Sequence, residues 1–319
     1  MKKILLLKGG MSSEREVSLV SGRECAAALR AKGYEVIEHD LVSLEGLAQA
    51  LAAKPDAVFN ALHGRWAEDG TIQGVLDLAG VPYTHSGLLA SALAMDKPVA
   101  RDVFAGRKLP VAEGGVFKRA DVLAGRALPI PFVMKPTNEG SSVGVRIVLE
   151  KSDLDALAAA PWPFDEEVLV EAYVPGRELT VAVMGHNGDA KPLGVLEIRP
   201  NNGFYDYAAK YTDGKAIHIC PAPIHKTAYA EAMRVALEAH RALGCRGVSR
   251  ADIRYDDTAG EPGRIVLLEV NTQPGMTPLS LVPEIAAASG VSFPDLCAWL
   301  VENATHDGPK AGPKNRRPA

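Results

Sequence analysis

Residues 267–277, L-L-E-V-N-T-Q-P-G-M-T, end an apolar run with a carboxylate and an amide side by side. Because alternate residues of a strand share a face, a strand here places Glu269 and Asn271 on the same side. A carboxylate on such a strand needs a cation or a strong hydrogen-bond donor, since an unpaired buried charge is costly. Residues 273–277 contain proline and glycine, which are typical of fixed turns with close backbone approach.

The preceding segment predicts the strand that pairs with this one. Residues 247–255, G-V-S-R-A-D-I-R-Y, are followed by the turn-rich segment 256–263 and then by the strand 264–270. The pattern predicts a β-hairpin with a long loop. If the two strands pair symmetrically about the loop, Asp252 lies opposite Glu269. The Cβ atoms of such a pair are roughly 4.5–5.5 Å apart, and like charges there repel each other.

A divalent cation would turn this repulsion into attraction. Asp252, Glu269 and Asn271 all offer hard oxygen ligands, a set that suits magnesium with phosphate completing the shell. Two alternatives stay open at this point. Asp252 pairs instead with Arg250 or Arg254, or the hairpin end is solvated and its charges never meet.

The composition is that of an ordinary globular protein. Hydrophobic residues make up 47% and charged residues 23% of 319 residues, which favours two or three domains. The net charge of -4 gives no footprint for nucleic acid or an anionic membrane, so neither is expected as a partner. The four cysteines form no C-x-x-C pair, and the apolar run at residues 4–7 is too short for a signal peptide or a membrane span. These features predict a cytoplasmic protein with reduced thiols.

The order of the expected elements predicts an α/β protein with three units and a tail. Alternating strands and helices in residues 1–95 favour a parallel sheet with ligands near the carboxyl ends of its strands. A second unit covers residues 96–176 and a third covers residues 177–304, while residues 305–319, rich in Gly, Pro, Lys and Arg, are expected to be disordered. The expected strands are 4–7, 36–37, 57–62, 81–83, 115–118, 132–135, 145–148, 167–172 and a half-buried one from 178 to 183; the expected helices are 71–79, 88–93, 152–159 and 227–243.

Two local predictions concern helix ends and a core histidine. A helix is expected to begin at Ser13, with Glu16 completing an S-x-x-E capping box, and to end at Gly33. In the helix 227–243, His240 lies on an apolar stripe and is therefore interpreted as structural.

Residues 135–144, K-P-T-N-E-G-S-S-V-G, join two expected strands. Such a loop can present backbone N–H groups to an anion, and Lys135 can add a charge to a phosphate. The alternative is an ordinary glycine hairpin with a surface lysine. Lys97 is a second candidate phosphate ligand or a solvated lysine. Glu171 and Glu178, near a connector between strands, either accept hydrogen bonds from a nucleotide or face solvent.

Taken in order, these pieces resemble the D-alanine–D-alanine ligase family. The matching segments are G-G-x-S-x-E-R-E-V-S at 9–18, L-H-G-R at 62–65, E-D-G-T at 68–71, M-D-K at 95–97, the loop 135–144, F-Y-D-Y at 204–207, A-K-Y at 209–211, R-x-D at 250–252, E-x-N-T at 269–272, G-M-T at 275–277 and S-L at 280–281. The resemblance covers residues 4 to 302. It implies an ATP-grasp fold of three α/β domains, the first Rossmann-like, with ATP held between the second and third.

The resemblance also implies a reaction. The carboxylate of one D-alanine attacks the γ-phosphate of ATP, and the amine of a second D-alanine then displaces phosphate from the acylphosphate, which yields a dipeptide for peptidoglycan. A homodimer is implied as well. The implied cofactor is a pair of magnesium ions, with manganese as an alternative metal, and ATP is a co-substrate.

The implied site residues fall into four groups. Catalytic roles go to Glu14, Ser141, Tyr211, Arg250 and Gly275; amino-acid substrate binding to His63, Ser280 and Leu281; ATP binding to Lys97, Lys135, Ser142, Glu171, Glu178 and Lys210; and metal binding to Asp252, Glu269 and Asn271. Ser141 and Tyr211 would link to Glu14 and close a loop over the site.

The sequence departs from the family pattern at two places. Trp66 and Ala67 follow H-G-R where many members carry two small residues, and Ala172 stands where some members have a lysine that contacts the nucleotide. Other functions on the same fold are a ligase that joins D-alanine to D-lactate or D-serine, a catalytically silent nucleotide-binding module, and a ligase for an unrelated carboxylate. The tyrosine at position 211 resembles the dipeptide-forming members.

Overall fold

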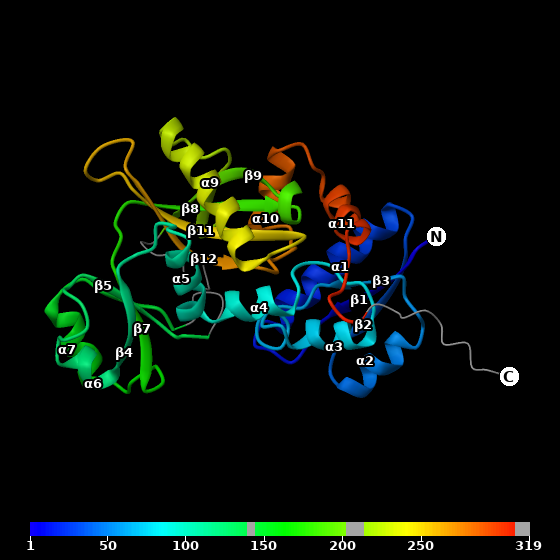
Figure 1. Cartoon of the computed structure of the whole chain (residues 1–319), viewed down its shortest axis with the longest axis horizontal. Coiled ribbons are helices and arrows are strands. Elements are labelled where there is room, and N and C mark those ends of the chain that lie inside the picture. Colours follow the sequence, from blue (N-terminus) through cyan, green and yellow to red (C-terminus); the bar gives the residue numbers. More distant parts are fainter. Residues whose placement is uncertain (139–143, 202–213, 310–319) are drawn as a thin grey trace.

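The computed structural model describes residues 1–138, 144–201 and 214–309, and in these residues three β-sheets carry the helices that pack on them (Figure 1). Residues 1–95 contain the parallel sheet that the alternating pattern predicted, in the order β2-β1-β3. Its strands are β1 (Lys3–Lys8), β2 (Glu35–Asp40) and β3 (Ala57–Asn60), and its helices are α1 (Arg15–Ala31), α2 (Leu44–Leu51) and α3 (Thr71–Ala79). The central strand β1 is fully buried over residues 4–7 because strands flank it on both sides.

Two predictions for this region were wrong. Helix α1 begins at Arg15 with Glu14 as its N-cap, so Ser13 and Glu16 form no capping box. The turn before it is held instead by the backbone N–H of Glu14, which donates to Ser12 Oγ at 3.2 Å. Residues 81–83 form no strand, since only Tyr83 makes an isolated parallel bridge to strand β3.

A four-stranded antiparallel sheet, in the order β4-β7-β5-β6, occupies the left end of the molecule in Figure 1. Its elements are β4 (Gly114–Lys118), α6 (Arg119–Leu123), β5 (Phe132–Lys135), β6 (Arg146–Val148), α7 (Lys151–Ala159) and β7 (Glu167–Ala172). Every strand predicted here is present. Strands β5 and β7 pair directly, which brings the ends that carry Lys135 and Glu171 into one sheet.

The third sheet is antiparallel, in the order β10-β9-β8-β11-β12. Its elements are β8 (Arg177–Met184), the single turn η1 (Asn187–Asp189), β9 (Lys191–Pro200), β10 (Ala216–Ile219), α9 (Lys226–Leu243), β11 (Val248–Asp256), β12 (Arg264–Asn271), α10 (Leu281–Ala288) and α11 (Phe293–Glu302). Strand β8 was predicted to be half-buried, but both of its faces are covered. Val181 and Val183 pack in the core with α9, whereas Ala182 and Met184 pack in the core with α10.

The hydrophobic cores cross the boundaries expected from the sequence. Helix α11 packs against α1, so Leu29 and Leu300 belong to one core that joins the first and third sheets (Figure 1). Helices α4 (Leu88–Met95) and α5 (Lys97–Gly106) pack against α9, and Phe104 lies in the core of the five-stranded sheet. The division into units at residues 95 and 176 stays a prediction, but α5 is anchored on the third sheet.

The segment after α11 returns to the first sheet. Thr305 forms an antiparallel bridge with Tyr83, and Asp307 pairs with Arg246 at 2.6 Å. Residues 305–309 are therefore ordered, contrary to the expectation that disorder begins at Thr305, and residues 310–319 lie outside the described part. None of the helices in the described ranges is both long and apolar enough to span a membrane.

Helix α9 confirms the interpretation of His240 as a core residue. Its side chain is fully buried, and Nδ1 lies 2.8 Å from Ser249 Oγ on β11. Burial lowers the pKa of His240 to about 4, so the imidazole is neutral at physiological pH.

Candidate active site

The hairpin of β11 and β12 brings Asp252 opposite Glu269, as the sequence predicted. The register is not symmetrical, however. Counting from the pair Asp256–Arg264 along a regular ladder would place Leu268 opposite Asp252, but a β-bulge between Asp252 and Ile253 shifts the register by one residue. Because a shift of one residue exchanges the faces of a strand, the bulge brings the two carboxylates together.

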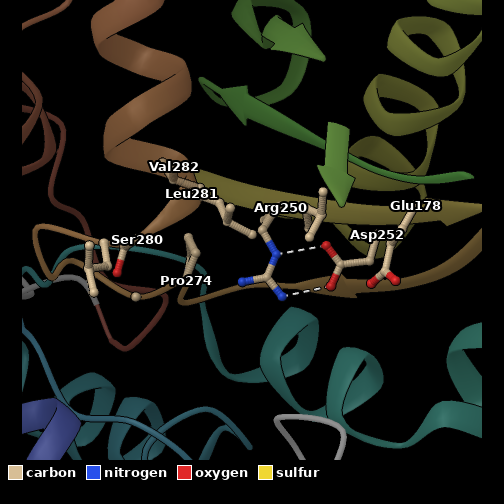
Figure 2. A pocket seen from close by; sticks show the side chains of 10 residues that line it. Glu178, Arg250, Asp252, Pro274, Ser280, Leu281 and Val282 are labelled. Atoms are coloured by element: carbon tan, nitrogen blue, oxygen red, sulfur yellow. Dashed lines mark hydrogen bonds and ion pairs between the residues drawn. The ribbon is translucent and has the colours of Figure 1, made fainter. Parts of the chain in front are cut away.

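Asp252 is held by Arg250 on its own strand. Arg250 Nε donates to Asp252 Oδ1 at 2.8 Å and Nη2 donates to Oδ2 at 2.7 Å, a bidentate ion pair, as Figure 2 shows. Thr180 Oγ1 on β8 also donates to Oδ1, at 2.8 Å. One of the two alternatives left open by the sequence, a pairing of Asp252 with Arg250, is therefore present. The pair remains partly exposed and lies in a pocket.

Glu269 and Asn271 lie further along the neighbouring strand. Lys97 Nζ, at the first residue of α5, is 3.2 Å from Glu269 Oε2. Asn271 Oδ1 accepts a hydrogen bond from the backbone N–H of Gln273 at 2.7 Å, which fixes the amide. Helix α5 thus places the ammonium group of Lys97 next to the Glu269 carboxylate on β12.

Lys135 and Glu171 form a second ion pair, with Nζ 2.7 Å from Oε2. Glu171 is only 4% exposed, so the alternative of a solvent-facing acid does not hold for this residue. Burial alone would lower the pKa of Lys135, but the carboxylates of Glu171, Glu269 and Glu178 outweigh it and raise that pKa. Lys135 is therefore a largely buried ammonium whose charged form is favoured by several acids. The backbone N–H of Lys97 donates to Thr137 O at 3.0 Å, which ties α5 to the loop that follows Lys135.

The segment after β12 docks on the first sheet through Gln273. Its side chain is 1% exposed, accepts a hydrogen bond from Asn60 Nδ2 at 2.7 Å, and donates to the carbonyl of Leu62. His63 follows Leu62 in the loop after β3. Its Nε2 lies 2.9 Å from Ser21 Oγ and its Nδ1 lies 3.3 Å from Glu68 Oε1.

Glu14 lies beside this loop. It is 7% exposed, and a Cβ atom added at Gly64 would lie 3.1 Å from Glu14 Oε1. Gly64 has a φ of +73°, in the left-handed region that favours glycine. Ser12 Oγ also donates to the carbonyl of His63 at 2.6 Å. The start of α1 and the L-H-G-R loop are therefore in contact.

The remaining residues surround the start of α10. Ser280 is the N-cap of α10, and Leu281 is its first helical residue. Ser280 Oγ accepts from the backbone N–H of Thr277 at 2.9 Å, and a Cβ atom at Gly275 would lie 2.7 Å from that oxygen. A side chain at position 275 would therefore require the Ser280 hydroxyl to move.

One pocket joins the Arg250–Asp252 pair to the start of α10. In Figure 2 Asp252 and Glu178 lie at one end, Ser280 lies at the other end, and Arg250 and Leu281 lie between them. The pocket is lined by Glu178, Ile198, Arg250, Asp252, Pro274, Gly275, Leu279, Ser280, Leu281 and Val282. It combines an ion pair with the N-terminus of a helix, where backbone N–H groups favour an anion.

The donor set at the hairpin end fits a hard cation. Asp252, Glu269 and Asn271 supply two carboxylates and an amide oxygen, which are ligands of magnesium. Within residues 1–138, 144–201 and 214–309, no group of three or more His, Cys, Asp and Glu side chains is arranged as a metal site. The set is therefore incomplete by itself and is suited to a metal that also binds phosphate oxygens.

Four expected site residues, Ser141, Ser142, Lys210 and Tyr211, lie outside the described residues. Conversely, sequence reasoning missed two residues that contact the predicted site residues, Gln273 beside Asn271 and Arg101 beside Glu171. Arg101 follows Lys97 by one helical turn, and its Nε lies 3.7 Å from Glu171 Oε1. No helix was predicted at residues 97–106, so the spacing of four residues that places Arg101 on the face of Lys97 was not used.

Comparisons with known proteins show which family the chain is similar to. The family model described as D-ala D-ala ligase C-terminus matches residues 109–302, and the one described as D-ala D-ala ligase N-terminus matches residues 38–86. The D-alanine–D-alanine ligase of Paramagnetospirillum magneticum is 57% identical over 310 residues, which cover 96% of this chain and 99% of the relative.

Two solved structures are similar along nearly the whole chain. The D-alanine–D-alanine ligase from Bacillus anthracis complexed with ATP has a TM-score of 0.77 and 28% identity, and covers 95% of this chain and 97% of its own. The VanG D-Ala:D-Ser ligase from Enterococcus faecalis has a TM-score of 0.78 and 31% identity, with 94% and 98% covered. The expected ATP-grasp fold is thereby confirmed. Because the family models match most of its length and a D-alanine–D-alanine ligase is 57% identical to it, the chain belongs to the D-alanine–D-alanine ligase family.

Proposed function

We propose that this protein joins two molecules of D-alanine to D-alanyl-D-alanine, with ATP converted to ADP and phosphate. The observation that carries the proposal is the pocket in which the Arg250–Asp252 pair faces the N-terminus of α10. Phosphoryl transfer depends on charge neutralisation and alignment, and an ion-pair cluster supplies these at one end. A carboxylate is held by the helix N-terminus at the other end. The relative with 57% identity carries the name of this activity.

The first step transfers the γ-phosphoryl group of ATP. The carboxylate oxygen of the first D-alanine attacks the phosphorus, the bond to the ADP oxygen breaks, and an acylphosphate forms. Lys97 and Lys135 are the cations assigned to the phosphates, while Glu171 and Glu178 accept hydrogen bonds from the nucleotide. Arg250 stabilises the acylphosphate, because its guanidinium is fixed by two hydrogen bonds to Asp252.

The second step forms the peptide bond. The amine of the second D-alanine attacks the acyl carbon, and phosphate leaves. The backbone N–H of Gly275 and the side chain of Arg250 are the donors assigned to the tetrahedral oxyanion. Ser280 and the Leu281 N–H hold the carboxylate of the second D-alanine at the start of α10.

The first D-alanine is assigned to the contact between the first turn of α1 and the L-H-G-R loop. Glu14 is placed to accept from its ammonium group, and His63 lies next to this position. Ser141 and Tyr211 are assigned to the closure of the site over Glu14, which would keep water from the acylphosphate. Ser142 and Lys210 are assigned to ATP.

Asp252, Glu269 and Asn271 are the residues that would hold two magnesium ions, or manganese in their place. Bound there, the metal would neutralise the charge that develops on the phosphate oxygens. The oxygen-only donor set supports this assignment. A protein that supplies peptidoglycan precursors is expected in the cytoplasm, and a homodimer is expected from the family resemblance.

The test measures ADP release with D-alanine, D-serine, D-lactate and L-alanine, each with and without magnesium. Release is expected only with D-alanine and metal, and L-alanine is expected to be inactive. A relative of the same fold is named a D-Ala:D-Ser ligase. The assay therefore tests the identity of the second substrate more sharply than the rest of the proposal. Equal phosphate release with D-lactate as second substrate at neutral pH would contradict the dipeptide assignment.

A further inference from the structure

Arg101 lies on α5, one turn after Lys97, and its side chain is 19% exposed. Its Nη2 donates to the carbonyl of Ala112 at 3.0 Å. Its Nε is buried and has no hydrogen-bond partner within the described part of the chain. That N–H is 3.7 Å from Glu171 Oε1, just beyond hydrogen-bond distance. Arg101 therefore has an unused donor aimed at a buried carboxylate.

Glu171 has two cationic neighbours, and only Lys135 lies within hydrogen-bond distance of it. Oε2 is paired with Lys135 at 2.7 Å, and Oε1 faces Arg101. The residue after it, Ala172, brings no charge. Glu171 is 4% exposed, so the loss of Lys135 as a partner would leave a carboxylate that water cannot solvate.

The proposed function, on which this inference rests, requires Lys135 at the phosphates of ATP. An ammonium that turns toward phosphate no longer neutralises Glu171 fully. We propose that Arg101 is a positioning residue that takes over Glu171 when Lys135 contacts phosphate, and so keeps the carboxylate in place to accept from the adenine amino group. A small movement of either side chain would close the gap of 3.7 Å to a hydrogen bond.

The backbone around Glu171 makes this contact specific. Arg101 bonds the carbonyl of Ala112, two residues before Gly114, and Gly114 pairs with Glu171 across strands β4 and β7. A Cβ atom at Gly114 would lie 2.3 Å from Val170 O and 2.8 Å from the Cα of Glu171, so the two strands approach very closely here. Arg101 thus contacts both the side chain of Glu171 and the segment that fixes its backbone.

The experiment compares ATP affinity, measured by calorimetry with magnesium, in the wild type, Arg101→Met, Arg101→Gln and Arg101→Lys. Loss of a hydrogen bond to a charged group weakens binding by about 10-fold or more, so the Met and Gln variants are expected to raise the ATP dissociation constant by about 10-fold. The Lys variant keeps a charge and is expected to recover most of the affinity. The KM for D-alanine is expected to change less than about 2-fold, because Arg101 lies on the nucleotide side.

A double-mutant cycle separates positioning from a general structural effect. In the Glu171→Gln background there is no carboxylate charge to neutralise, so Arg101→Met is expected to change ATP affinity less than about 2-fold. The matched control is Arg234→Met, which removes an exposed arginine paired with Glu231 on α9 and is expected to leave ATP affinity unchanged. Thermal melts show whether each variant is folded, and Arg101→Gln serves if Arg101→Met is not.

Equal effects of Arg101→Met in both backgrounds, or an unchanged ATP dissociation constant in Arg101→Gln, would overturn the inference. These readouts do not depend on which amino acids are joined. A wild-type protein that binds ATP but releases no ADP with D-alanine would refute the proposed function and leave the role of Arg101 to be decided by the binding data.

Discussion

Two arginine–carboxylate pairs on the five-stranded sheet look alike in sequence and differ in their surroundings. Arg250 and Asp252 are two residues apart on β11, and Glu197 and Arg199 are two residues apart on β9. Both are bidentate, with distances of 2.8 and 2.7 Å in the first and 2.9 and 2.9 Å in the second. Local spacing alone therefore cannot distinguish a site from a structural ion pair.

The neighbours make the difference. Glu197 is 2% exposed and accepts two further bonds, at 2.8 and 2.6 Å, from Arg177 on β8, so its charge is saturated by two arginines. Asp252 instead lies opposite Glu269 and lines a pocket with Glu178. Acids that line a pocket can be reached by a bound ligand or cation, whereas a carboxylate covered by two arginines can only stabilise the fold.

The largest expected effect follows from removal of the acid opposite Asp252. Glu269→Ala is expected to lower kcat for ADP release by about 10³-fold or more, because charge stabilisation in the transition state is lost. The melting temperature is expected to stay close to that of the wild type, since Glu269 is partly exposed. The matched control is Glu24→Ala, an exposed acid on α1. Near-normal turnover in Glu269→Ala would remove the metal role from this strand.

Removal of one arginine from each pair tests the comparison directly. Arg250→Met is expected to lower kcat by about 10²-fold, the effect of losing one donor to a developing oxyanion. Arg199→Met is expected to change kcat less than about 2-fold, because Arg199 is half exposed and Glu197 keeps Arg177. Similar losses in the two variants, measured in the same ADP-release assay, would mean that the surroundings do not separate the pairs.

The saturated pair is expected to matter for stability. Glu197→Ala leaves Arg177 and Arg199 next to each other without their acid, and is expected to lower the free energy of unfolding by about 2 kcal/mol. The value is below that of a fully buried pair because both arginines reach solvent. Urea unfolding gives the change, and kcat per folded molecule serves as the control. An unchanged unfolding midpoint would show that the cluster adds no stability.

The smallest expected effect is a dependence of that stability on pH. Burial opposes the charged form of Glu197, but hydrogen bonds from Arg177 and Arg199 outweigh it and lower its pKa. Because the folded-state pKa lies below the unfolded value of about 4.3, the contribution is complete above that value and is lost as the pH falls through the folded-state pKa. The difference in unfolding midpoint between wild type and Glu197→Gln should therefore narrow between pH 5 and pH 3. A difference that stays constant would rule out this linkage.

Prediction from the sequence was most successful where the pattern was local or came as ordered motifs. The strands 132–135 and 167–172 and the helix 71–79 have the predicted ends, and Gly80 ends that helix with a φ of +65°. The pairing of Asp252 with Glu269 was predicted as well, although for a symmetrical register. The bulge that produces it was not predicted, because it arises where β12 also contacts the segment at Pro110 and Val111, far away in sequence.

The capping box at Ser13 and Glu16 shows how a local pattern can be overridden. The motif is present, but the turn before α1 bonds through Ser12, whose hydroxyl also reaches the carbonyl of His63. A hydrogen bond to a loop that is fifty residues away fixed where the helix begins. Strand β8 shows the same effect, since only the packing of α10 buries the face that looked exposed.

The sequence alone thus determined the fold class and the family and predicted the acids, lysines and arginine of the candidate site, because strand period, turn residues and ordered motifs are local features of the chain. The tertiary structure decided which of these groups meet. Gln273 joins the loop after β12 to the first sheet, and α5 brings Lys97 to Glu269 and Arg101 to Glu171. Such contacts depend on side chains held by separate elements of the fold, and no local pattern of residues specifies them.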